Sequence, residues 1–138
     1  MATPVLDPPV ARPSVARTAT LWVFRLLALL QAVLFVLQPI SIGSFLQGSW
    51  TAFEMHSVVG SVLVLPTMLT MVVGLLLGIL ARRVWVAVGS LALGVLTTLQ
   101  VGIGHAGLTS VHVPLGVALV GLAVWLSVWS WTRRARWA

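Results

Sequence analysis

The sequence predicts an all-α integral membrane protein, an up-down bundle of four transmembrane helices with both termini in the cytoplasm. Apolar residues make up 59% of the 138 residues and charged residues only 7%, and the mean hydropathy is +1.10, a composition suited to a bilayer. Several apolar runs approach the ~20 residues that a helix needs to cross a bilayer. They lack the alternation of apolar and polar residues that is typical of the strands of a membrane β-barrel.

The elements follow from these runs, because backbone groups inside a bilayer must be paired within their own segment. The helices are expected over residues 20–41, 54–81, 84–104 and 111–131. The first run is longer than the apolar region of a signal peptide and no small-residue cleavage motif follows it, so we expect it to be a retained span. Residues 1–17 are rich in proline and are expected to form a disordered cytoplasmic tail. Residues 18–138 then form a single four-helix domain.

The net charge of +6 comes from eight basic residues, all arginines, whose positions argue against nucleic-acid binding. They lie near the two ends of the chain and at Arg82 and Arg83, and none lies within 39–55 or 105–110. This distribution is typical of arginines on the cytoplasmic side of a membrane. It predicts a multi-pass protein of the plasma (inner) membrane whose partner is the lipid bilayer. Arg25, near the inner end of the first helix, is expected to extend toward the membrane surface.

The frame His-x-x-x-Gly occurs twice, as HSVVG over 56–60 and HVPLG over 112–116, in a chain with three histidines. The second and fourth helices run in the same direction. At ~1.5 Å per residue, both histidines lie about 30–40 Å from the inner boundary, near the outer face. The second and fourth helices of an up-down bundle are diagonal partners. We therefore expect His56 and His112 to face each other across the bundle.

Small and weakly polar residues share a helical face with each histidine, and such residues belong in the interior of a membrane bundle. The expected interior positions are Gly60, Leu63, Thr67, Thr70, Gly74 and Gly78 on the second helix, Ser90, Gly94, Thr97, Val101, Gly104 and His105 on the third, and Gly116, Leu119, Ala123, Ser127 and Ser130 on the fourth. Both histidines should therefore point inward. Gly60 and Gly116, one turn deeper, would leave room for a flat ligand.

Two imidazoles on opposite sides of a cavity can fill both axial positions of a haem iron, and a neutral imidazole suits a dry site. We therefore expect His56 and His112 to bind the iron of haem b, with Gly60 and Gly116 lining the macrocycle. The other ring nitrogen of each ligand needs a hydrogen-bond partner, for which backbone carbonyls are expected. His105 is expected in or beside the outer loop, as a surface residue or a contact of a haem propionate.

Two helix hairpins resemble each other, since each has Leu-Gln near the end of its first helix (37–38 and 99–100) and His-x-x-x-Gly at the start of its second. The segment TLQVGIGHAGLTSVHVPLGVAL resembles the third helix, loop and fourth helix of one half of haem A synthase. Each half of that family is a four-helix bundle with histidines on its second and fourth helices, so the resemblance implies that His56 and His112 are the axial pair. The chain has one half only, and Ser57 stands where the family usually has arginine.

The expected function is electron transfer or haem handling, alone, as a homodimer or within a larger respiratory-type membrane complex. Three alternatives stay open. In the first, the chain is a haem-free structural or accessory subunit, and its histidines cap helices or pack between them. In the second, the chain is a haem A synthase-like enzyme, in which Glu54 is the candidate acid–base group. In the third, Glu54, His56, His105 and His112 bind zinc or copper. Glu54 is otherwise expected in the first turn of the second helix, where the helix dipole favours a negative charge.

Overall fold

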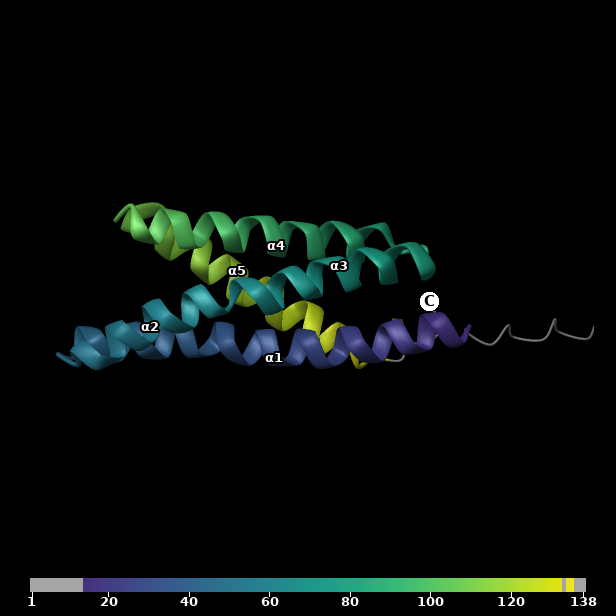
Figure 1. Cartoon of the computed structure of the whole chain (residues 1–138), viewed down its shortest axis with the longest axis horizontal. Coiled ribbons are helices and arrows are strands. Elements are labelled where there is room, and N and C mark those ends of the chain that lie inside the picture. Colours follow the sequence, from purple (N-terminus) through teal and green to yellow (C-terminus); the bar gives the residue numbers. More distant parts are fainter. Residues whose placement is uncertain (1–13, 133, 136–138) are drawn as a thin grey trace, which may run out of the picture.

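The computed structural model describes residues 14–132 and 134–135, and the described chain is helical with no strands, which confirms the all-α prediction (Figure 1). The helices are α1 (Val15–Leu46), α2 (Trp50–Val62), α3 (Val64–Leu80), α4 (Val84–His105) and α5 (Thr109–Ser130). α1 begins at Val15, inside the segment expected to be a tail, because the Ser14 side chain accepts a hydrogen bond from the Arg17 backbone N–H and caps the helix. The rest of the expected tail, residues 1–13, lies outside the described residues.

Four helical segments are long and apolar enough to cross a membrane, with α2 and α3 together counting as one, from Trp50 to Leu80. The helices extend further than expected, so the connections that we expected over 42–53 and 105–110 shrink to residues 47–49 and 106–108. Gly48 and Gly107 have φ of +97° and +72°, a backbone conformation that glycine adopts without strain. These two glycines allow tight turns, and the flanking residues remain helical.

The second span bends at Leu63, between α2 and α3. Pro66 has no N–H to donate to the carbonyl of Val62, and its ring crowds that carbonyl. Leu63 keeps helical dihedral angles, φ −59° and ψ −25°, so the chain bends and continues. Proline also lies inside α1, at Pro39, and inside α5, at Pro114.

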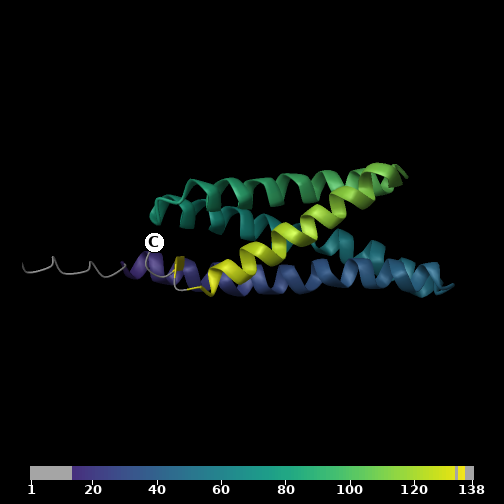
Figure 2. The same ribbon diagram turned by 180° about the vertical axis from the view of Figure 1, so that it is seen from behind.

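The spans pack as an up-down bundle: α1 contacts α2, α3 and α5, and α4 contacts α3 and α5. α5 crosses the bundle obliquely, from the end of α4 to the N-terminal part of α1 (Figure 2). The second span and α5 are therefore diagonal partners, as predicted. We call the end with the connections 47–49 and 106–108 the histidine end, and the end with the connection 81–83 the arginine end.

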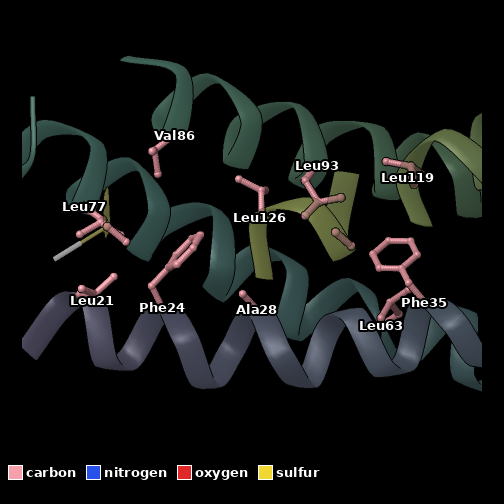
Figure 3. Close-up of a cluster of buried hydrophobic side chains, with 12 residues drawn as sticks. Leu21, Phe24, Ala28, Phe35, Leu63, Leu77, Val86, Leu93, Leu119 and Leu126 are labelled. Carbon is pink, nitrogen blue, oxygen red and sulfur yellow. The ribbon is translucent and has the colours of Figure 1, made fainter. Parts of the chain in front are cut away.

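The packed interior lies toward the arginine end (Figure 3). Its largest fully buried apolar side chains are Phe24, Leu77, Val86, Leu93, Leu119 and Leu126. Its buried polar residues are Arg25, Gln31, Thr67, Thr70, Ser90, Thr97, Ser127 and Ser130. Most of the expected interior positions of this half are buried, which confirms the helix faces chosen from the sequence.

The histidine end is packed much less tightly. Within the described residues 36–62 and 98–118, Ala52 is the only one that is buried. At this end the α1–α2 and α4–α5 hairpins lie apart in both views (Figures 1 and 2). The two hairpins are therefore joined mainly through the packed half.

Arg25 does not extend to the surface as expected. Its side chain is 3% exposed, and its Nε donates a 2.8 Å hydrogen bond to the carbonyl of Ser130, the last residue of α5. The guanidinium lies 4.7 Å from the ring centre of Trp22 and 5.0 Å from that of Trp131. A cation at a helix C-terminus is stabilised by the helix dipole, and contact with two indole rings adds to this.

Candidate functional site

The structure brings His56 of α2 and His112 of α5 together at the histidine end. Their ring centres are 6.1 Å apart and the ring planes are inclined by 71°. Both side chains are half-buried. The juxtaposition of two histidines that are 56 residues apart in the chain follows from the diagonal placement of their helices.

Hydrogen bonds to α1 set the proton position on His56. Its Nδ1 lies 3.3 Å from the backbone oxygen of Gln38 and 3.3 Å from Oγ of Ser41. The Ser41 hydroxyl donates to the same Gln38 oxygen, so its own oxygen is left to accept. A carbonyl oxygen only accepts, and therefore the proton is on Nδ1 and the lone pair is on Nε2.

His112 is held in the same way by α4. Its Nδ1 donates to the backbone oxygen of Gln100 at 3.1 Å, which again leaves the lone pair on Nε2. In return, Nε2 of the Gln100 side chain donates a 2.7 Å hydrogen bond to the backbone oxygen of His112. Among the described residues, neither histidine Nε2 has a hydrogen-bond partner.

The two hairpins, each with Leu-Gln followed by His-x-x-x-Gly, therefore form the same histidine–glutamine hydrogen bond. In each hairpin, a glutamine carbonyl near the end of the first helix accepts from a histidine near the start of the second. The glycine of each frame faces the same glutamine, since a Cβ on Gly60 would lie 3.5 Å from Oε1 of Gln38 and one on Gly116 2.8 Å from Nε2 of Gln100. Gly116 leaves room for the Gln100 amide, whereas a Cβ at Gly60 would make only ordinary contact with Gln38. Contact with a flat ligand stays a prediction.

Beside the histidine pair lie two further features that the sequence alone did not predict. A Cβ on Gly104 of α4 would lie only 2.7 Å from Cε1 and 3.0 Å from Nδ1 of His112, so the imidazole lies directly against the α4 backbone. Nε2 of Gln38 and Oε1 of Gln100 are buried without a hydrogen-bond partner in the described part of the chain. Buried polar atoms are normally paired, and these two remain available to a bound group.

Glu54 and His105 do not join the pair. Glu54 is exposed and is the fifth residue of α2, which begins at Trp50, so the prediction that it lies in the first turn is wrong. His105 is the exposed last residue of α4, and its Nδ1 donates to Val101 of its own helix at 2.9 Å. No three acidic, histidine or cysteine residues of the described chain come together as a metal site. The alternative zinc or copper site with four ligands is therefore not formed.

The separation of the two imidazoles can be compared with that of two histidines bound to one metal. With a metal–nitrogen bond of about 2.0–2.1 Å and about 1.1 Å from nitrogen to ring centre, two imidazoles on opposite sides of one metal have centres about 6.3 Å apart. The observed separation is 6.1 Å. Histidine ligands usually donate their second N–H to a carbonyl or carboxylate, which is the arrangement here.

The fold and the site together define the class of protein. It is a helical bundle with four spans long enough to cross a membrane, and it has a pair of histidines that are both protonated at Nδ1. No family model, curated protein or solved structure matches the chain. Function is therefore inferred from the chemistry of the site itself.

Proposed function

We propose that the chain is a multi-pass membrane protein that binds haem b between His56 and His112 and acts in electron transfer or haem handling. The observation that supports this proposal is the matched imidazole pair, with ring centres 6.1 Å apart and each Nδ1 donating to a glutamine carbonyl. Both Nε2 lone pairs are then free to bind a metal. The resemblance to haem A synthase suggests the same pair.

The residues of the chain have distinct roles in this proposal. His56 and His112 would hold the iron, while the carbonyls of Gln38 and Gln100 keep the proton on Nδ1 and increase the basicity of the ligating nitrogen. Haem supplies one-electron redox chemistry when it is bound. With both histidines holding the group, its metal would have no free position for a substrate, so electron transfer is favoured over binding of a substrate at the metal.

The distribution of charge supports one orientation of the chain across the membrane. The arginines of the described chain lie at the arginine end, and Glu54, its single acidic residue, lies at the histidine end. By the tendency of arginines to stay on the cytoplasmic side, both termini would be cytoplasmic and the histidine pair would lie near the outer face of the plasma membrane. The redox partner would then be a second copy or another subunit of a respiratory-type membrane complex.

The test is an absorption spectrum of detergent-purified protein, expressed with ample haem, in oxidised and dithionite-reduced states. We expect a Soret band and sharp reduced α and β bands, lost in both His56→Ala and His112→Ala. His105→Ala is the matched control, because its side chain is exposed and bonds only its own helix, and it should keep the spectrum. A featureless visible spectrum would overturn the proposal and favour the haem-free accessory subunit.

A further inference from the structure

A shallow groove lies at the arginine end, at the opposite end of α5 from His112. Its volume is about 420 Å³, and it is lined by Trp125, Val128, Trp129, Thr132 and Arg134. The first two of these side chains are 52% and 62% exposed, so much of the lining would face lipid. The groove combines an apolar wall with a hydroxyl group and a cationic residue at one end.

The wall of the groove is fixed by packed tryptophans. The ring centre of Trp85, in the first turn of α4, lies 4.9 Å from that of Trp125 and 4.6 Å from that of Trp129. Trp129 also packs edge-on against the buried Phe24. Tryptophan has a large apolar ring and one N–H donor, which suits the boundary between acyl chains and headgroups. The same contacts place the start of α4 beside the groove.

The charge around the groove is positive. Arg134 lines it, and Arg82 and Arg83 immediately precede α4, whose N-terminus has no side-chain cap. The N-terminus of a 22-residue helix favours a nearby anion through its dipole and its unpaired N–H groups. Within the described chain the only carboxylate side chain is that of Glu54, near the opposite end of its span. No acidic side chain of the described residues therefore offsets this charge.

We infer that this groove binds the headgroup phosphate of an anionic phospholipid, with the acyl chains lying along Trp125 and Val128. Arg134 and the start of α4 would attract the phosphate, and the tryptophan wall would contact the glycerol and upper acyl region. A zwitterionic lipid presents the same phosphate beside its own cation, so it gains less from a positive groove. The apolar lining favours a whole lipid over free phosphate.

The test is native mass spectrometry of the detergent-purified full chain, titrated with phosphatidylglycerol or phosphatidylcholine of matched acyl chains. We expect phosphatidylglycerol to bind at least about five-fold more tightly, since one arginine near an anionic surface is worth about that factor. Arg134→Gln should weaken phosphatidylglycerol binding by about five-fold and leave phosphatidylcholine binding nearly unchanged. Trp125→Leu should weaken binding of both lipids.

Trp50→Leu is the matched control, because Trp50 is 63% exposed and lies at the histidine end, and its lipid binding should equal that of the wild type. Equal affinities for the two lipids would overturn the inference, as would an Arg134→Gln variant that binds phosphatidylglycerol like the control. Displacement of the lipid by millimolar inorganic phosphate or glycerol 3-phosphate would overturn the assignment to a whole lipid. Repeating the titration with His56→Ala separates this site from the proposed haem.

Discussion

Replacing Gly104 by alanine is the sharpest perturbation of the histidine pair that the structure offers. Gly104 lies on α4 two turns beyond Thr97, and the imidazole of His112 occupies the space where its side chain would begin. The added methyl group would lie 2.7 Å from Cε1 and 3.0 Å from Nδ1 of the ring. The contacting atoms belong to the far end of the His112 side chain, so we expect the ring to move.

The size of this movement can be compared with the tolerance of a metal bond. Ordinary contact begins at 3.4 Å, whereas the new methyl would lie 2.7 Å from the ring, so the imidazole has to shift by roughly 0.7 Å. Metal–ligand distances tolerate only about ±0.2 Å. We therefore expect Gly104→Ala to displace His112 from its proposed bond to the iron and to weaken the hydrogen bond from His112 to the Gln100 carbonyl.

The assay is the reduced absorption spectrum together with the haem content per chain, with Gly102→Ala as the control. Gly102 is also inside α4 and has no atom within 4 Å of its Cβ position, so its alanine variant should keep the wild-type spectrum and gain a little helix stability. Gly104→Ala should lose the sharp α and β bands or most of the haem. If both variants gave the wild-type spectrum and haem content, the placement of His112 as an iron ligand would be refuted.

Two further predictions concern the packed half of the bundle. Gly74→Ala would press its methyl group into Ser90 and the ring of Phe24, so the α3–α4 contact should weaken and the free energy of unfolding should fall by about 1–3 kcal/mol. Thermal unfolding in detergent measures this loss of stability. The control is Gly121→Ala, whose Cβ would have no atom within 4 Å and which should leave the stability nearly unchanged. Equal melting temperatures of the two variants would contradict the close approach of α3 and α4. Arg25→Met keeps an apolar stem but removes the hydrogen bond to Ser130 and the contacts with Trp22 and Trp131, and should lower the free energy of unfolding by about 2 kcal/mol. The exposed Arg82 provides its control, and an Arg82→Met variant as unstable as Arg25→Met would show that the loss comes from charge alone.

The sequence allowed the spans, the buried faces of the packed half and the histidine pair to be predicted, because each depends on periodicity and connectivity, whereas the expected interior positions Gly60, Val101, Gly104 and Gly116 at the histidine end are not buried. Rows of small and weakly polar residues at helical spacing identified the interior of the packed half, including Thr67, Ser90 and Ser127. The up-down order then placed His56 opposite His112, and the rings do lie near each other. Neither step needed knowledge of side-chain conformations.

The immediate surroundings of the pair could not be predicted in the same way. The contact of Gly104 with His112, and the hydrogen bonds of Gln38 and Gln100, depend on how far one helix is shifted and rotated against its neighbour. Helical periodicity does not determine that shift. The repeated Leu-Gln dipeptides were a usable signal, but only the three-dimensional arrangement reveals that their carbonyls accept from the histidines. The burial of Arg25 likewise depends on where α5 ends.

The prolines have a mechanical consequence. Pro39 in α1 and Pro114 in α5 lie in the loosely packed half near the level of the histidine pair, and Pro66 in α3 lies in the packed half. Each proline removes one main-chain hydrogen bond from its helix and makes bending easier at that point. Bending at Pro39 and Pro114 would move the two sides of the histidine pair, while the half beyond is held by its buried core. Such bending would change the distance between the α1–α2 and α4–α5 hairpins, and with it the distance between His56 and His112, without unfolding the bundle.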